Sequence, residues 1–287
     1  MSSLLDVDRQ PFSEAFARRP FPVRHSLAER SMLGLDAVAE LADNLPLSSI
    51  ERHRADLPLV MPGGAPEIGG PPSETVRGIE HNGCWMVLWN IEDAPEYARI
   101  LNDLLDEAEQ SVGLRPGDMR NRQAFLFLSA PNAVTPVHFD PEHNFLLQIR
   151  GEKEMNVGKF VNREEERREL ERYYSGGHRN LELIPEDATS FRMSPGDGVY
   201  VPSFAPHFVR NGSDVSVSLS ITFRTRASER NENVHRLNAR LRRFNRSPRP
   251  AGQSRTADWT KAAIVSAADR LRGKRAGRRE KPPAQKV

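Results

Sequence analysis

The stretch from Val215 to Phe223, VSVSLSITF, constrains the fold more than any other part of this sequence. Apolar and hydroxyl-bearing side chains alternate strictly along it. A period of two is that of a β-strand, because successive side chains point to opposite faces of a sheet. We therefore predict a half-buried strand with one apolar face and one Ser/Thr face.

Several other short apolar runs lie between turn residues, which favours an antiparallel sandwich or barrel. These predicted strands cover 84–89, 124–128, 145–149, 153–157 and 199–201. Helical spacing predicts helices over 31–45, 95–112 and 162–174, and two more after residue 225, the second near 259–271. A Pro/Gly-rich segment, 62–75, is expected to be a loop.

These elements together predict a mainly β fold with flanking helices. We expect a double-stranded β-helix, or jelly roll, over 121–226, preceded by an N-terminal helical and mixed α/β region over 1–120. A C-terminal helical extension is expected over 227–272. The last residues, 273–287, are basic and lack aromatic side chains, so we expect a disordered tail.

Composition excludes several classes of protein. No stretch approaches 18 consecutive apolar residues, so the sequence predicts no membrane-spanning helix, and its first residues do not resemble a secretory signal. The single cysteine, Cys84, excludes a disulfide framework and a cysteine-rich zinc site. We therefore expect a cytoplasmic protein that does not associate with membranes.

Charge is distributed unevenly along the chain. From Arg224 to the end there are 19 Lys and Arg and 5 Asp and Glu, a net charge of +14, whereas the preceding residues carry −12. Such a basic end either contacts nucleic acid or an acidic partner, or is simply a solvated terminus.

The residues with the clearest chemical meaning are His138 and Asp140, within TPVHFDPEHN. In a strand, positions i and i+2 project to the same face, so an imidazole and a carboxylate would lie side by side. With one distant histidine they would form the 2-His-1-carboxylate set of non-haem iron(II) oxygenases. A His-x-Asp pair alone is common on protein surfaces, so it is also compatible with no function.

A second motif, GDGVYVPSFAPHFVRN, supplies a candidate for the distant histidine. A turn at Gly196 and Asp197 precedes a short strand that ends at Pro202, and His207 then opens the next strand. The remaining histidines lack such a partner and are interpreted as structural or surface residues. Among them, His143 is expected on the loop that follows Asp140.

Over roughly residues 120–225, the chain resembles the JmjC-type, cupin-like iron(II)/2-oxoglutarate oxygenases, particularly the branch around the asparaginyl hydroxylase of hypoxia signalling. In that family a Thr lies three residues before the first ligand histidine, an Asn six after it and a Lys fifteen after it. Here these offsets from His138 fall on Thr135, Asn144 and Lys153, the last in QIRGEK where the family has QIKGYK. The family phrase GDVLYIPMYWWH corresponds to GDGVYVPSFAPH, which ends at His207.

The resemblance implies a set of roles. Three residues would hold Fe(II): His138, Asp140 and His207. Lys153, helped by Thr135, would bind the distal carboxylate of the cosubstrate 2-oxoglutarate, and Asn144 would hydrogen-bond its chelating end. Ser220 lies near the position of a second family Asn. Without the resemblance, each of three residues also has a purely structural interpretation. Lys153 would flank a hairpin turn, Thr135 would begin a strand and Asn144 would lie in a turn.

The function implied is hydroxylation of a protein or peptide side chain, with decarboxylation of 2-oxoglutarate to succinate. No catalytic residue is expected beyond the metal and cosubstrate ligands. Ala205 and Pro206 stand where the family has bulky aromatic residues near the pocket mouth, so the resemblance does not identify the substrate. A small-molecule substrate is also compatible with the sequence. The insertion at 159–184 and the loop at 62–75 are expected to face it.

Two other functions remain open. One is a non-enzymatic cupin-like regulatory or binding protein whose basic tail contacts nucleic acid, and the other is a metal-dependent cupin that does not use 2-oxoglutarate. We also expect a homodimer through the C-terminal helices, where four apolar residues share helical spacing: Val234, Leu237, Leu241 and Phe244. The alternative for these four residues is packing on the body of the protein.

Overall fold

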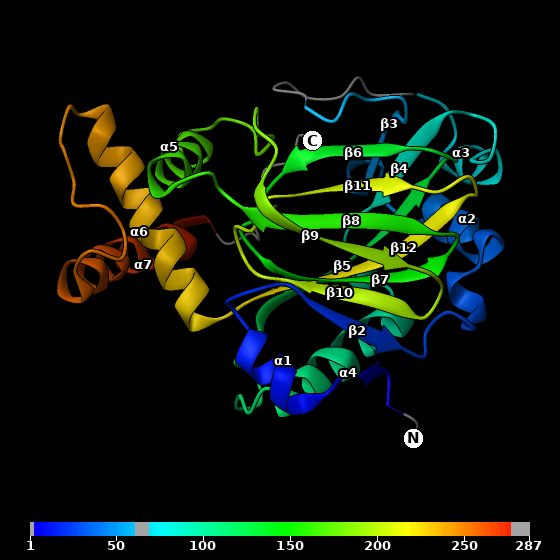
Figure 1. The fold of residues 1–287 in the computed structure, drawn as a ribbon, viewed down its shortest axis with the longest axis horizontal. Coiled ribbons are helices and arrows are strands. Elements are labelled where there is room, and N and C mark those ends of the chain that lie inside the picture. The colour runs from blue at the N-terminus through cyan, green and yellow to red at the C-terminus, as the bar shows by residue number, and fades with distance from the viewer. Residues whose placement is uncertain (1–2, 61–68, 277–287) are drawn as a thin grey trace.

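The computed structural model describes residues 3–60 and 69–276 and contains two facing antiparallel sheets flanked by helices (Figure 1). The strands are β1 Leu5–Asp6, β2 Phe21–His25, β3 Ile50–Arg54, β4 Cys84–Leu88, β5 Arg120–Ser129, β6 Val134–His138, β7 His143–Arg150, β8 Lys153–Lys159, β9 Glu186–Met193, β10 Asp197–Val201, β11 His207–Asn211 and β12 Ser216–Arg224. The helices are α1 Arg9–Ala15, α2 Leu35–Asn44, α3 Pro72–Arg77, α4 Pro95–Ser111, α5 Arg163–Tyr173, α6 Arg226–Arg243 and α7 Arg255–Ala276, with 3₁₀ turns η1 Ser31–Leu33, η2 Leu47–Ser49 and η3 Ile91–Asp93.

The two sheets confirm the predicted jelly roll. The larger sheet has the strand order β1-β2-β10-β7-β12-β5-β4-β3, and the smaller has the order β6-β11-β8-β9. Six of the ten neighbouring pairs join strands that are not consecutive in sequence, as expected for a double-stranded β-helix. Strands β1, β2 and β3 were not predicted from the sequence, and they extend the larger sheet at its two edges. Strand β9 was also missed, because it is an edge strand whose side chains are mostly polar and exposed.

Strand β12 alternates as predicted, but it is buried on both faces rather than half-buried. Its apolar face packs outward against the N-terminal helices, and its Ser/Thr face points into the jelly roll. The prediction was wrong about burial, because the alternating pattern distinguishes an apolar face from a hydroxyl-bearing face but does not show which elements pack on either one. Here the covering helices come from a distant part of the chain.

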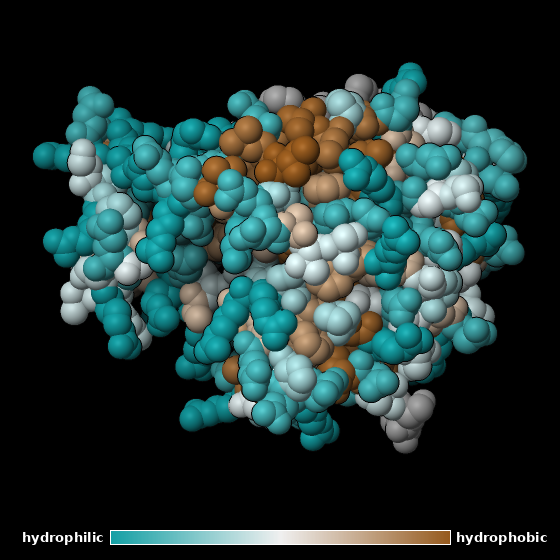
Figure 2. All heavy atoms as spheres, in the orientation of Figure 1, coloured by the Kyte–Doolittle hydropathy of each residue, from teal (hydrophilic) through white to brown (hydrophobic). Residues whose placement is uncertain are grey.

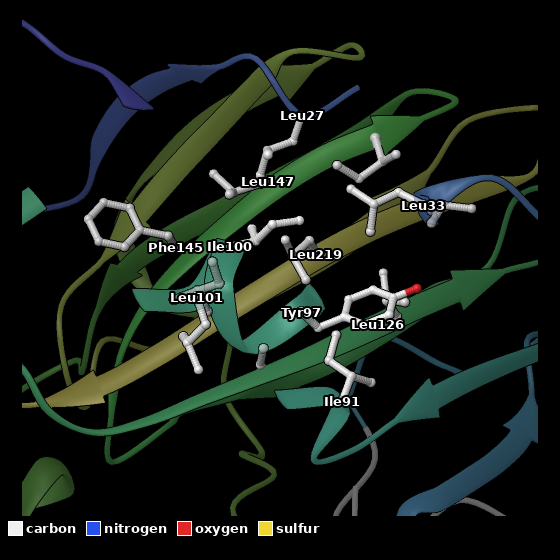
Figure 3. Close-up of a cluster of buried hydrophobic side chains, with 14 of the residues drawn as sticks. Leu27, Leu33, Ile91, Tyr97, Ile100, Leu101, Leu126, Phe145, Leu147 and Leu219 are labelled. Atoms are coloured by element: carbon white, nitrogen blue, oxygen red, sulfur yellow. The ribbon is translucent and has the colours of Figure 1, made fainter. Parts of the chain in front are cut away.

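The largest hydrophobic core therefore lies outside the barrel, between the larger sheet and helices α2 and α4 (Figure 3). Tyr97, Ile100 and Leu101 of α4 point from one side toward Leu147 of β7 and Leu219 of β12. This arrangement confirms the predicted apolar face of α4. The space between the two sheets holds a smaller apolar cluster, which includes Leu146, Met155 and Val199, beside the polar side chains described below.

The turn between β7 and β8 places Lys153 at the first position of β8. Gly151 in this turn has a φ of +69°, and a Cβ at this position would collide with the backbone oxygen of Val215. Only glycine adopts this conformation and permits this close approach without strain. The turn therefore fixes where β8 begins.

Two sequence expectations need correction at helix boundaries. Residues 72–75 are helical rather than loop, because Pro72 occupies the first turn of α3, where proline is favoured. Helix α7 continues to Ala276, so residues 273–276 are helical and not disordered. The expectations for 61–68 and 277–287 lie outside the described residues.

The insertion, residues 159–184, contains α5, which packs against α6 of the C-terminal helix pair (Figure 1). Ion pairing of Arg242 on α6 with Glu171 on α5 joins them. Of the four apolar residues expected at a dimer face, Val234 is buried within the chain and Phe244 is 78% exposed. Packing on the body thus accounts for part of this pattern, and the dimer stays a prediction.

Within the described residues, no helix is both long enough and apolar enough to cross a lipid bilayer.

Candidate functional site

A pocket inside the jelly roll is lined by all seven residues that the sequence analysis selected. They come from β6, β7, β8, β11 and β12 and from the loop after β6: Thr135, His138, Asp140, Asn144, Lys153, His207 and Ser220. The free space among the lining side chains is about 50 Å³, so the pocket suits a small molecule or ion. The seven residues span 86 positions of the chain, and the antiparallel register brings them together.

Two histidines and one aspartate face one another at one end of this pocket. His138 ends β6 and pairs directly with His207, the first residue of β11. Asp140 lies just after β6 rather than within it, which corrects the expectation of a strand position. Its Oδ2 is nevertheless 4.0 Å from Nε2 of His138 and 3.5 Å from Nε2 of His207. These three donor atoms form a group able to hold one metal ion.

Backbone carbonyl groups fix the tautomer of both histidines. Nδ1 of His138 lies 2.8 Å from the oxygen of Pro136, and Nδ1 of His207 lies 2.8 Å from the oxygen of Ala205. A carbonyl oxygen only accepts hydrogen bonds, so each Nδ1 carries the proton and donates it. Each Nε2 therefore presents its lone pair to the pocket, as metal coordination requires.

The charges of the three side chains also suit a divalent cation. Burial, together with the nearby His207 and Arg179, lowers the pKa of His138 to about 3, so its imidazole is neutral at physiological pH. Burial alone would raise the pKa of Asp140, but the Arg179 guanidinium and the two histidines hold it below its ordinary value. Neutral imidazoles and an ionised carboxylate are the donor set that iron(II) favours in non-haem oxygenases, so these residues fit that metal.

Arg179 is a residue of the site that sequence reasoning missed. It is 5% exposed, lines the pocket and forms an ion pair with Oδ1 of Asp140. The segment after α5 delivers it: Asn180 bridges to His138, and the Leu181 N–H donates to the Val137 oxygen at 2.9 Å. The ion pair at Oδ1 leaves Oδ2 directed at the two histidines. No local sequence pattern marks an arginine that reaches the site through a long insertion.

Lys153 lies at the start of β8, the strand that pairs with the His207 strand β11, so it lies on the same wall of the pocket as His207. Val157 of β8 pairs with His207, and Met155 and Lys153 follow at alternate positions, so all three share the inward face. The separation along the strand from Val157 to Lys153 is about 13 Å. Burial lowers the pKa of Lys153 to about 7 from its ordinary value of 10.5. A buried ammonium group of this kind favours an anionic ligand as its partner.

Hydroxyl and amide groups line the space between the metal-binding end and Lys153. The Ser220 hydroxyl donates to Oδ1 of Asn144 at 2.8 Å, across the pairing of β12 with β7. Thr222 lies two residues further along the same face, and its buried Oγ1 has no hydrogen-bond partner among the described residues. Sequence reasoning did not select Thr222, although its spacing from Ser220 was a usable signal. An unpaired buried hydroxyl is consistent with a polar ligand.

Aromatic side chains form the opposite wall of the pocket. Trp85 and Trp89 come from β4 and the residue after it, and Phe125 and Phe127 come from β5. The rings of Trp89 and Phe125 are 4.5 Å apart at their centroids. None of these four residues was predicted as part of the site, because the pairing of β4 with β5 is not visible in sequence. Such a wall keeps water away from bound reactants.

His143 has a structural role. It is the first residue of β7 and not a loop residue, which corrects the sequence expectation. Its Nδ1 lies 2.8 Å from the Tyr200 hydroxyl, and its ring stacks on Phe16 and Phe223. It does not line the pocket.

Comparison with known proteins agrees with this fold and site. Residues 119–231 match the family model of the JmjC domain. Residues 119–231 therefore form a JmjC-type, cupin-like domain, within which His138, Asp140 and His207 are grouped so that they could hold a metal ion. None of the curated proteins matches the sequence significantly.

Among solved structures, the chain is similar to a ribosomal oxygenase of Escherichia coli, YcfD. One crystal structure of YcfD has a TM-score of 0.57 and 17% identity, with 93% of this chain and 69% of that chain covered. A second, in complex with cobalt and 2-oxoglutarate, has a TM-score of 0.52 and 16% identity, with 92% and 67% covered. At this level of identity the similarity establishes a shared fold.

Proposed function

We propose that this protein hydroxylates a side chain of a protein or peptide, with iron(II) as cofactor and 2-oxoglutarate as cosubstrate. One observation carries the proposal. A single pocket combines two histidines and one carboxylate, whose donor atoms face one another, with a buried lysine on the same wall. A metal site alone would not need that lysine.

His138, Asp140 and His207 would hold the metal through three adjacent positions and leave the others for the cosubstrate and dioxygen. When bound, iron(II) supplies the chemistry that activates dioxygen, and 2-oxoglutarate supplies two electrons through its oxidative decarboxylation to succinate and carbon dioxide. Arg179 keeps the Asp140 carboxylate ionised and oriented.

Lys153 would bind the distal carboxylate of 2-oxoglutarate with a charge-assisted hydrogen bond. Thr135 lies on the same pocket lining and would add a hydroxyl donor, while Asn144 and Ser220 would hydrogen-bond the chelating end. The aromatic wall excludes water from the reacting groups, which limits unproductive oxidation.

A macromolecular substrate is supported by the surface around the pocket. Figure 2 shows hydrophobic side chains gathered on the surface above β6 and beside α5. Exposed apolar residues flank α5 within or next to the insertion: Val161, Leu183 and Ile184. A polypeptide can pack on such a surface while one of its side chains enters the narrow pocket. The similar E. coli protein is a ribosomal oxygenase, so ribosomal proteins are the first substrates to test.

The cosubstrate is tested by anaerobic absorption spectroscopy. Metal-free protein is titrated with iron(II) and then with 2-oxoglutarate, beside the variant Lys153→Met. We expect a visible metal-to-ligand charge-transfer band that requires both additions and weakens in the variant. Iron binding without a band would instead favour a cupin that does not use 2-oxoglutarate, and no iron binding would favour a non-enzymatic binding protein.

The substrate class is tested by mass spectrometry. Purified ribosomal proteins are incubated with the enzyme, iron(II), 2-oxoglutarate and air, with His207→Ala as the inactive control. We expect one protein to gain the mass of one oxygen atom only with the wild-type enzyme. Succinate formation that no polypeptide stimulates would contradict a protein substrate.

A further inference from the structure

A second cavity of about 810 Å³ lies outside the jelly roll, between α6, α7 and the ends of β5 and β12. This volume is within the range of ligand sites, about 300–1,000 Å³. Six arginines line it, and we call it the arginine cleft: Arg120, Arg224, Arg226, Arg230, Arg236 and Arg270. The arginine cleft is separate from the metal-binding pocket, because no residue lines both.

The carboxylates of the cleft neutralise only half of these arginines. Arg120 pairs with Glu229 at 2.8 Å, Arg236 pairs with Asp269 at 2.7 Å, and Arg224 pairs with Glu232. No other Asp or Glu lines the cleft.

Three arginines have no carboxylate partner among the residues that line the cleft, and two of them, Arg230 and Arg270, remain as surplus positive charge. Arg226 is exposed and lies 3.7 Å from Asp118, outside the cleft. Arg230 and Arg270 are exposed and form no ion pair with any residue that the structure describes. The cleft therefore presents uncompensated cations to solvent, an arrangement that attracts polyanions.

An aromatic ring lies among these charges. Trp259 is 60% exposed, and the guanidinium carbon of Arg230 lies 5.4 Å from its ring centroid. Small side chains beside it on α7, including Ala263 and Ala267, leave space above the helix. An exposed indole next to a guanidinium group is a stacking platform for planar bases.

The surroundings of the cleft are strongly basic. Residues 224–276 contain 15 Lys and Arg and 4 Asp and Glu, a net charge of +11. Figure 2 shows mostly hydrophilic side chains over the α6 and α7 region. The field of this region adds to the charge within the cleft.

We propose that the arginine cleft binds single-stranded nucleic acid, with phosphates on Arg226, Arg230 and Arg270 and a base stacked on Trp259. An acidic peptide would use the arginines but not the exposed ring, so the ring favours nucleic acid. Proteins that bind single strands without sequence preference combine these same two features.

The test measures fluorescence anisotropy of a labelled RNA of ~10 nucleotides, within typical site sizes, and of DNA of the same sequence. We expect both to bind the full-length protein, with log K falling linearly with log salt concentration. The double variant Arg230→Gln and Arg270→Gln should bind more weakly and reduce the salt slope by about two. Trp259→Leu should weaken binding about 5- to 150-fold without changing that slope.

Two control variants remove the same charge elsewhere in the full chain. Arg9→Gln with Arg18→Gln changes α1 and the turn that follows it, and Arg278→Gln with Arg279→Gln changes the C-terminal end. Neither should affect binding as strongly as the cleft variant. A tail variant that abolishes binding while the cleft variant binds normally would overturn the proposal. Competition by polyglutamate as effective as that by RNA, or no effect of Trp259→Leu, would also overturn it.

Discussion

Replacing Lys153 by methionine should stabilise the metal-free protein while weakening its binding of 2-oxoglutarate. The substitution keeps an unbranched side chain of similar length, so the packing of β8 changes little. Burial lowers the pKa of Lys153 from 10.5 to about 7, which means that the folded protein disfavours the ammonium group. At 1.36 kcal/mol per pKa unit, this depression corresponds to roughly 5 kcal/mol.

The sign of the pH dependence follows from proton binding. Between pH 7 and 10.5 the unfolded chain binds more protons at Lys153 than the folded protein does, so the wild-type protein gains stability as pH rises through this window. The advantage of Lys153→Met is therefore full, on the order of 5 kcal/mol, at pH 6.5 and falls to about 1 kcal/mol at pH 9.5.

Urea denaturation of the metal-free proteins at these two pH values measures the difference directly. The exposed Lys159 at the end of β8 provides a matched control, and Lys159→Met should change stability little at either pH. Isothermal titration of the manganese(II)-loaded proteins should show 2-oxoglutarate binding about 10- to 150-fold weaker in Lys153→Met, the loss of one charged hydrogen bond. A variant less stable than wild type at pH 6.5, or equally stabilised at both pH values, would refute this reasoning.

Three further predictions concern other parts of the molecule. Arg179→Met should destabilise the metal-free protein by about 3–5 kcal/mol because it leaves the Asp140 carboxylate buried without a partner, and manganese(II) should stabilise this variant more than the wild type; an equal metal-induced rise in melting temperature would contradict that role. Gly151→Ala should destabilise the protein by about 1–3 kcal/mol, measured by urea denaturation, since alanine cannot adopt this turn without strain. If the C-terminal helices form a dimer, light scattering should give twice the chain mass of 32.3 kDa, reduced to one chain by Phe244→Ser; a monomeric wild-type protein would show this prediction to be wrong.

The sequence was informative where strand register alone determines geometry. Thr135, Asn144 and Lys153 lie at fixed offsets from His138, and the short connections by which β6, β7 and β8 alternate between the two sheets bring them into one pocket. The strict alternation of β12 likewise predicted its two faces, although not its burial on both sides.

Other parts of the site depend on contacts between distant segments. Arg179 reaches Asp140 because the chain returns to β6 after α5, and nothing in its neighbouring residues indicates that return. Trp85 and Trp89 reach the pocket because β4 pairs with β5 across the 31 residues of helix and loop that separate them. Local patterns do not encode such pairings, so these residues were found only in the structure.

The three candidate metal ligands are held in place in two different ways, and this limits how the site can be tuned. Each histidine is oriented by a carbonyl group of its own chain, two residues earlier, which no side-chain substitution removes. Asp140 is oriented by a side chain that a single codon change can replace. Mutation outside the ligands can therefore adjust the carboxylate while both imidazoles stay fixed. Directed evolution of metal preference in this protein should accordingly begin at position 179.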